Sequence, residues 1–293
     1  MTNRLVRFDW AMKKLLRNKA NFEILEGFLS ELLKQDVRIE SILESESNKN
    51  SLADKQNRVD LLTQVGSGEL VLIELQVEAQ YDYFHRMVYG TSKLITDNMD
   101  SGSSYDKVRK VISINIVYFD LGHGEDYVYH GTTEFRGMHN HDLLQLSASQ
   151  QNQIRNHTLA PETFSEYYVL KVFNFNDRIQ HTLDEWMYFF KNCKIKSEFS
   201  AKGLQKAAEE LDLLKLSPEE RGAYYNYIED RRVIESSVKT AWLEGKHKGL
   251  EESKLEGTLE IAIAMIKYGE SSEKVRKYTG LTDDEIDGLR KTG

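Results

Sequence analysis

The N-terminal part of the chain switches between helix-like and strand-like patterns of hydrophobic residues. Residues 9–34 place apolar side chains at three- and four-residue spacing, which predicts helix, and Asn18 to Asn21 interrupt the pattern. Residues 37–43 suit a short strand, and residues 58–78 suit two strands that fold back through Gly66-Ser67-Gly68. The pattern therefore predicts one or two helices followed by three strands.

The next segments complete a recognisable order of elements. Residues 81–99 return to helical spacing, and residues 110–119 are apolar on both sides, which is typical of a central strand buried on both faces. The predicted order is α-β-β-β-α-β, and a mixed sheet with a helix on each face follows from that order. Residues 127–135 and 167–175 indicate further strands that flank the sheet, and residues 183–193 indicate a short helix.

From about residue 200 the chain is helical in character. Residues 202–215 and 218–246 have long helical patterns, and the second begins with a Ser-Pro-Glu-Glu start signal. The glycine-rich repeat in residues 244–257 is not expected to form a stable helix. Three short helices should follow, over residues 259–267, 271–278 and 282–289. We therefore predict two domains, 1–199 and 200–293, the second being an all-helical extension with a three-helix tail module.

The second strand of the predicted hairpin carries the most informative polar residues. The odd-numbered positions from 71 to 77 are β-branched or leucine and suit a buried face, so Glu74 and Gln76 share the other face, roughly 7 Å apart. If the loop has three residues, counting outward places Asp60 opposite Glu74, with Cβ atoms about 5 Å apart. Two carboxylates at that distance suit a hard divalent cation.

Two alternatives to this metal site stay open at this point. A two-residue loop would pair Asp60 with Leu75 and turn the Asp60 side chain to the other face. In the second alternative, Asp60 and Glu74 are solvated residues on an exposed sheet face, which is ordinary for charged strand residues.

Composition excludes several classes of protein. The chain is 40% hydrophobic with fifteen tyrosines, twelve phenylalanines and three tryptophans, so it can bury a core and is not globally disordered. A single cysteine, Cys193, excludes a disulfide framework and a cysteine zinc cluster. We find no signal-peptide pattern and no run of about eighteen apolar residues that would span a membrane. A reducing, cytoplasmic location fits these features best.

Charge adds one local feature. The net charge is −8, which does not indicate nucleic-acid binding. The first twenty residues, however, hold six basic residues and one acidic residue, Asp9. This basic segment would suit phosphate contacts or, equally, a solvated helix face.

Several short stretches resemble segments of one protein family. They are Phe8-Asp9-Trp10-Ala11-Met12-Lys13-Lys14-Leu15, Asp54-Lys55 with Arg58-Val59-Asp60, Ile73-Glu74-Leu75-Gln76, Arg86 with Tyr89 and Lys93, and the tail from Leu243 to Leu289. Each stretch is short, and their order and spacing make the match specific. Together they resemble the recombination-promoting nucleases, also called transposases, of the PD-(D/E)XK nuclease superfamily.

The resemblance implies a restriction-endonuclease-like αβββαβ core and a metal-dependent DNA endonuclease in recombination or mobile-element biology. It implies that Asp60 and Glu74 bind Mg²⁺, or Mn²⁺ in its place, and that Gln76 stands where many relatives have a catalytic lysine. Gln76 can orient a water molecule but carries no charge. The sequence leaves three outcomes open for this departure from lysine. The protein could be a slow enzyme, Arg86 or Lys93 could supply the charge that Gln76 lacks, or the protein could be inactive.

The resemblance also suggests supporting residues and partners. Asp9 is the first candidate for a further acidic ligand from the first helix, and Glu23 and Glu26 are the next candidates. Lys13 lies in the same segment as Asp9. DNA is the expected substrate, and symmetric cutting of both strands would need a homodimer. The rival hypotheses are an inactive nuclease-fold module that binds DNA or a protein, and a scaffold whose tail drives assembly.

Two short motifs have ordinary structural interpretations. The sequence His139-Asn140-His141-Asp142 contains the letters of an HNH nuclease, but that class is defined by dispersed residues. The two histidines with Asp142 could bind a transition metal, and a polar surface loop is the better interpretation. Gly66-Ser67-Gly68 lacks the lysine of a phosphate-binding loop and is a turn. Tyr81, Tyr83, Phe84 and Tyr89 could stack on bases, but aromatic residues at helical spacing are more often core.

Overall fold

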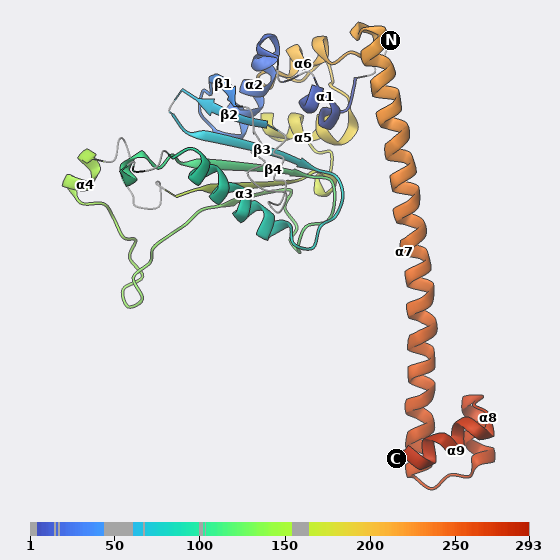
Figure 1. Cartoon of the computed structure of the whole chain (residues 1–293). Coiled ribbons are helices and arrows are strands. Elements are labelled where there is room, and N and C mark those ends of the chain that lie inside the picture. Colours follow the sequence, from blue (N-terminus) through green and yellow to red (C-terminus); the bar gives the residue numbers. More distant parts are fainter. Residues whose placement is uncertain are drawn as a thin grey trace. The chain divides into compact units, whose positions relative to one another are not determined.

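A six-stranded mixed sheet forms the centre of the computed structural model, which describes residues 5–14, 16, 18–43, 61–66, 68–99, 102, 104–153 and 164–292. The strand order across the sheet is β1-β2-β3-β4-β6-β5 (Figure 1). The strands are β1 Ile39–Leu43, β2 Leu61–Val65, β3 Leu70–Gln76, β4 Val111–Val117, β5 Val128–Gly131 and β6 Glu166–Lys171.

The pairing of the strands confirms the predicted mixed sheet. β1, β2 and β3 are antiparallel neighbours, β3, β4 and β6 are parallel, and β5 returns antiparallel at the far edge. Every residue of β4 is buried, as expected of the apolar run that predicted a central strand. The parallel part of the sheet therefore holds β3 next to the most buried strand of the molecule.

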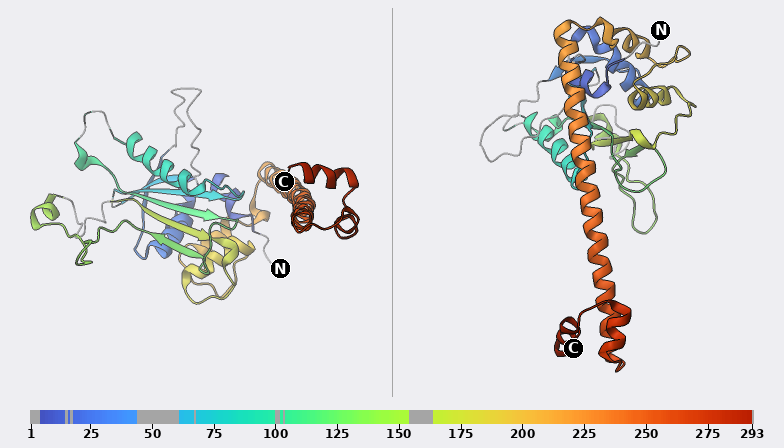
Figure 2. Two further views of the ribbon diagram at one scale, coloured as in Figure 1. Left: turned by 90° about the horizontal axis from the view of Figure 1, so that it is seen from below. Right: turned by 90° about the vertical axis from the view of Figure 1, so that its right-hand side faces the viewer.

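Helices cover both faces of the sheet, as the element order predicted (Figures 1 and 2). One face carries α3, Tyr83–Asp97, whose Leu94 packs with Leu70 and Leu72 of β3. Because side chains alternate along a strand, Leu70, Leu72, Glu74 and Gln76 all lie on this face. The other face carries α1 Phe8–Lys14, α2 Phe22–Leu33, α5 Thr182–Asn192 and α6 Leu204–Glu210.

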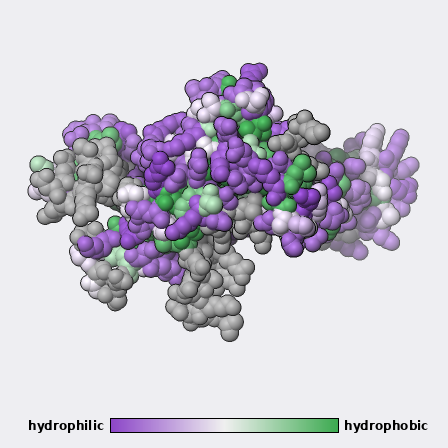
Figure 3. All heavy atoms as spheres, turned by 90° about the horizontal axis from the view of Figure 1, so that it is seen from above, coloured by the Kyte–Doolittle hydropathy of each residue, from purple (hydrophilic) through white to green (hydrophobic). Residues whose placement is uncertain are grey.

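A cluster of aromatic rings holds this second helix layer together. Phe8 of α1 contacts Phe28 of α2 and Trp186 and Phe190 of α5, with ring centroids 4.5 to 6.4 Å apart. Such edge-on and tilted ring pairs add to the free energy of burial. The outer surface, seen from the side of this helix layer, is mostly hydrophilic (Figure 3).

The β2–β3 hairpin has the register that a three-residue loop predicts. Leu61 pairs with Ile73 and Gln64 with Leu70, and the backbone N–H of Val65 donates to the carbonyl of Glu69. The loop closes with a hydrogen bond from Gly68 N–H to the carbonyl of Val65 at 2.8 Å, and Gly68 has a φ of 89°. The two-residue alternative is therefore wrong.

The chain folds into two compact units, Met1–Tyr224 and Tyr225–Gly293. The first unit includes α6, which packs on α2, so it extends past the predicted boundary at residue 199. In the described part of this unit, the remaining short elements are α4 Ala148–Gln153 and 3-10 turns at Lys19–Asn21, Tyr105–Lys107, Val172–Asn174 and Leu213–Lys215.

The described residues of the C-terminal unit form helices that are joined by two short turns. α7, Pro218–Lys267, is followed by α8 Ser272–Thr279 and α9 Asp283–Thr292. The end of α7 and the two short helices enclose a small core of Ala262, Val275, Leu281 and Ile286. Ser271 and Thr282 cap the short helices through bonds to Lys274 N–H and Glu285 N–H.

Two helix predictions for the C-terminal part were wrong. The glycine-rich segment 244–257 belongs to the unbroken helix α7, where Lys248 forms an ion pair with Glu252 one turn further along the helix. Each glycine costs a helix about 1 kcal/mol, and the surrounding helix formers outweigh that cost. The helix predicted over residues 202–215 is shorter and ends at Glu210. No helix among the described residues is long and apolar enough to cross a membrane.

Candidate active site on the β2–β3 hairpin

Glu74 lies near the end of β3 and is almost completely removed from water. Its residue surface is 4% exposed, so the solvated interpretation of this carboxylate does not hold. A cation lies beside it, because Nε of Arg86 in α3 is 3.8 Å from Glu74 Oε2. A buried carboxylate is costly unless a charge or donor compensates it. Arg86 supplies that compensation from the helix that covers this face.

Gln76, two residues further along β3, has a more open environment. Its side chain is half-buried, and Nε2 donates to the carbonyl of Glu78 at 3.1 Å. This contact directs the amide nitrogen along the chain after β3. Gln76 thus offers the site a polar amide without a charge.

Asp60, the other predicted metal ligand, lies outside the described residues. Glu74 and Gln76 provide oxygen donors of the kind that hard divalent cations prefer. Within the described ranges, no group of three or more His, Cys, Asp or Glu side chains is arranged as a metal site. The described donors therefore fit Mg²⁺ in kind, and Asp60 would be needed to complete a pair of carboxylates.

Asp9, the candidate acidic ligand from the first helix, binds the neighbouring Arg7. The Arg7 Nε lies 3.1 Å from Asp9 Oδ1, and Trp10 N–H also donates to this carboxylate. Desolvation lowers the pKa of Arg7, but the charge and hydrogen bonds of Asp9 outweigh it, and the pKa is raised overall. Asp9 therefore stabilises the chain around α1, which belongs to the helix layer opposite α3 (Figure 1).

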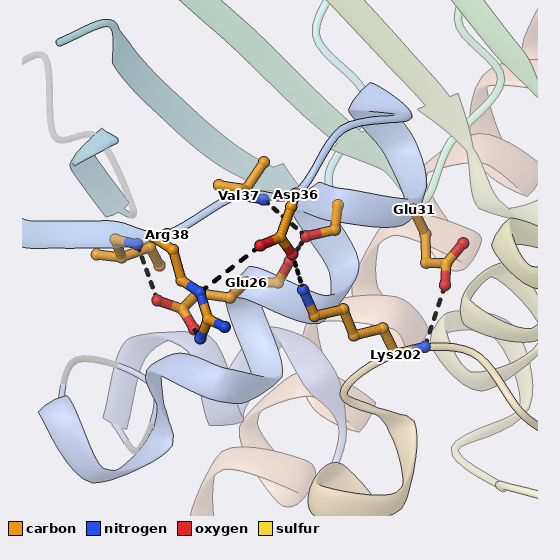
Figure 4. Close-up of polar contacts among 8 residues, drawn as sticks. Glu26, Glu31, Asp36, Val37, Arg38 and Lys202 are labelled. Carbon is orange, nitrogen blue, oxygen red and sulfur yellow. Dashed lines mark hydrogen bonds and ion pairs between the residues drawn. The ribbon is translucent and has the colours of Figure 1, made fainter. Parts of the chain in front are cut away.

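Glu26, the reserve candidate in α2, has a structural role that the contacts explain. Its carboxylate accepts from Ile39 N–H at 2.9 Å and from Arg38 Nη1 at 3.4 Å, which ties α2 to the start of β1 (Figure 4). Glu23, the other reserve, is exposed. The contacts of Glu26 join it to β1 and not to Glu74.

The remaining supporting candidates lie on two helices. Lys13 lies in α1. Lys93 lies in α3, two turns after Arg86, and forms an ion pair with Asp97 at 3.1 Å. Arg86 is thus the supporting candidate that the structure places against Glu74.

Two site residues were missed by sequence reasoning. Asn115 of β4 pairs with Glu74 in the parallel register, and the phenol of Tyr83 donates to Asn115 Oδ1 at 3.1 Å. Both residues are fully buried. The signal was present, because Ser113 and Asn115 are polar residues at alternate positions of a strand that is otherwise apolar on both faces. Of the four aromatic residues interpreted as core, only Tyr83 is buried, and Tyr81, Phe84 and Tyr89 are exposed.

An apolar cavity of about 320 Å³ lies beside α3, lined by residues of α3, β5 and β6 that include Phe84, Val88, Tyr129 and Tyr167. Its wall is almost entirely apolar, so it offers little to hold a metal ion or a phosphate. The loop that contains His139 and His141 is exposed, as predicted. Neither the cavity nor this loop offers a polar group as buried as Glu74.

Comparison with known protein families gives a match over most of the chain. The family model described as PD-(D/E)XK nuclease family transposase matches residues 6–241. No curated protein and no solved structure matches the chain significantly. The matched range contains the whole sheet, both helix layers and the first half of α7.

Proposed function

Because the chain belongs to the PD-(D/E)XK nuclease family transposases, we propose that its β2–β3 hairpin carries a divalent-metal-dependent endonuclease site for DNA. The observation that carries this proposal is the buried Glu74 carboxylate beside Arg86, with Gln76 on the same strand face. We further propose that the protein acts in DNA recombination or mobile-element biology, as the family description suggests.

The hairpin register supports Asp60 as the partner of Glu74. Leu61 pairs with Ile73, so the same register continued by one residue would set Asp60 opposite Glu74. Directly opposed residues of an antiparallel pair have Cβ atoms about 5 Å apart, which suits two carboxylates that share a cation. Asp60 and Glu74 would hold Mg²⁺, or Mn²⁺ in its place.

Asp60 and Glu74 would hold the divalent cation, whose chemistry when bound would be to polarise the phosphate and to lower the pKa of the attacking water. The chain's own groups have separate tasks. Gln76 would orient the water through its amide, and Arg86 would stabilise negative charge on the phosphate oxygens through its guanidinium. Double-strand cutting at a symmetric site would require a homodimer.

The test is conversion of supercoiled plasmid to nicked or linear DNA in Mg²⁺, in Mn²⁺ and in EDTA. We expect Glu74→Gln and Asp60→Asn to lower cleavage by about a hundredfold or more, because groups that merely orient a metal ligand are worth roughly 10- to 100-fold. Glu78→Gln is the matched control, since Glu78 is an exposed carboxylate just after the same strand. Cleavage that persists in both site variants would show that the hairpin is not the active site.

One observation favours a second candidate, a nuclease-fold module that binds DNA or a protein partner without cleaving DNA. Gln76 carries no charge, and its amide nitrogen is engaged with Glu78. Calorimetric titration with Mn²⁺ separates the two functions. Binding that Glu74→Gln abolishes supports the nuclease, whereas absence of Mn²⁺ binding together with retained DNA binding supports the module.

A further inference from the structure

Two polar contacts join the first turn of α3 to neighbouring residues of the sheet. Arg86 pairs with Glu74 of β3 at 3.8 Å, and Tyr83 donates to Asn115 of β4 at 3.1 Å. Glu74 and Asn115 are themselves partners in the parallel register. The first turn of α3 therefore contacts one row of the sheet through two side chains that lie three residues apart, on the same face of the helix.

Asn115 can accept from Tyr83 in only one orientation of its amide. Its Nδ2 donates to Ser113 Oγ at 3.0 Å and to the carbonyl of Tyr168 at 3.2 Å. A carbonyl oxygen accepts and cannot donate, so the amide nitrogen must face Tyr168 and Oδ1 must face Tyr83. Because Asn115 is fully buried, no water competes for this oxygen.

The ring of Tyr83 is held as firmly as its hydroxyl group. Tyr83 is fully buried, packs in a cluster with Met87, Val117 and Val169, and meets the edge of Phe119 with ring centroids 5.7 Å apart. A satisfied polar contact in an apolar core specifies one arrangement, because every shifted arrangement leaves a buried group without its partner. The contact thus fixes both the position and the rotation of the first turn of α3.

We propose that Tyr83 and Asn115 are positioning residues that hold Arg86 beside Glu74. This inference rests on the proposed function, in which the Glu74 carboxylate binds the cation and Arg86 faces the phosphate. A displacement of about 1 Å at a reacting centre is enough to cost up to a hundredfold in rate. The Tyr83–Asn115 hydrogen bond keeps the guanidinium from such a displacement.

The structure offers a matched control on the same helix. Tyr167 of β6 and Thr91 of α3 share a hydrogen bond at 2.7 Å between the phenol and the hydroxyl group. Tyr83→Phe and Tyr167→Phe each remove one phenolic hydroxyl from a contact between α3 and the sheet. Only the first contact adjoins Glu74 in the register.

The first measurement needs no activity. In full-length protein with ¹⁵N-labelled arginine, the side-chain Nε–H resonance of Arg86 is assigned by its loss in Arg86→Lys. We expect Tyr83→Phe to shift this resonance and Tyr167→Phe to leave it in place. An unshifted resonance in Tyr83→Phe, or an equal shift in both variants, would overturn the proposal.

The second measurement is the single-turnover rate of DNA cleavage in saturating Mn²⁺. We expect Tyr83→Phe to slow cleavage about tenfold in the wild-type background and less than about twofold in the Arg86→Gln background, since the two residues act as one unit. A Tyr83→Phe variant that shifts the resonance but cleaves at the wild-type rate would also overturn the proposal. A shifted resonance in a protein that never cleaves DNA would reject the nuclease function and keep the positioning of Arg86.

Discussion

At the scale of single residues, Glu74 has an environment that an ordinary strand carboxylate does not have. It is removed from water, faces a guanidinium and stands next to a buried amide in the neighbouring strand. Each of these neighbours comes from a different element, namely α3 and β4. The chemistry of the site thus depends on residues that sequence spacing alone does not bring together.

Substitutions of Gln76 test how strongly the rate of DNA cleavage depends on a positive charge at this position. We predict that Gln76→Lys raises the rate of metal-dependent cleavage by about tenfold, because a cation at this position can orient the water and offset developing negative charge. Gln76→Met, which has similar length without a polar group, should lower the rate. The measurement is plasmid nicking under identical Mg²⁺ conditions, and equal rates for all three proteins would separate Gln76 from the chemistry.

Glu166 gives a prediction about stability and pH. Burial raises the pKa of this carboxyl, but hydrogen bonds from Lys110 and His130, at 2.5 and 2.9 Å, outweigh burial and hold the pKa below its usual range. A lowered folded-state pKa stabilises the protein above the unfolded value of 4.5, and this contribution is lost as the pH falls through the folded-state pKa.

We therefore predict that Glu166→Gln lowers the free energy of unfolding by about 1 kcal/mol at neutral pH, after allowance for solvent screening. The difference from wild type should shrink as the pH is stepped down through 4.5 and should vanish below the folded-state pKa. Urea unfolding at each pH is the measurement, and Glu134→Gln is the exposed control. A difference that grows on acidification would contradict the assignment.

At the scale of elements, α2 passes very close to the backbone that precedes α6. A Cβ added to Gly27 would lie 2.3 Å from the carbonyl oxygen of Lys202, and Gly203 has a φ of 82° that favours glycine. We predict that Gly27→Ala lowers the free energy of unfolding by about 2 kcal/mol or more, because backbone rather than a flexible side chain must move.

The control for this substitution is Gly245→Ala in α7, where no atom lies within 4 Å of the added Cβ. We expect it to slow amide hydrogen exchange around residue 245, since alanine favours a helix over glycine by about 1 kcal/mol. Thermal unfolding measures the first variant and hydrogen exchange the second. If Gly27→Ala unfolds at the wild-type temperature, the close approach of α2 to the Lys202 backbone is not maintained in solution.

Elements could be predicted from sequence where a few neighbouring residues determine them. The hairpin register followed from Gly66-Ser67-Gly68, and the buried β4 followed from its apolar run. The continuous α7 did not, because the helix formers around its glycines and the Lys248–Glu252 ion pair together outweigh the cost of glycine, which the glycine-rich pattern alone does not show. The burial of Glu74 and the Tyr83–Asn115 contact also could not be predicted, since they depend on how α3 crosses the sheet.

At the scale of the whole molecule, the first unit depends on residues beyond 199. Glu185 accepts from Ser200 and Ala201 N–H, and Tyr224 meets Trp10 with ring centroids 5.3 Å apart. We predict that a chain ending at Tyr224 unfolds in one cooperative transition, whereas a chain ending at residue 199 does not. Near-ultraviolet circular dichroism on heating is the measurement. A cooperative transition in the shorter chain would place the boundary at residue 199.

The link between the two ends of the first unit has a consequence for how the protein is made. Val6 N–H donates to the carbonyl of Leu211 at 2.9 Å, and Leu5 forms a β-bridge with Asp212. A ribosome adds roughly 5 to 20 residues per second, so the segment at Leu5 must wait about 10 to 40 s for its partner to be synthesised. The helices around residues 259–292 meet partners within a few dozen residues and wait only seconds. Nascent chains should therefore need protection of their N-terminal segment for most of their synthesis.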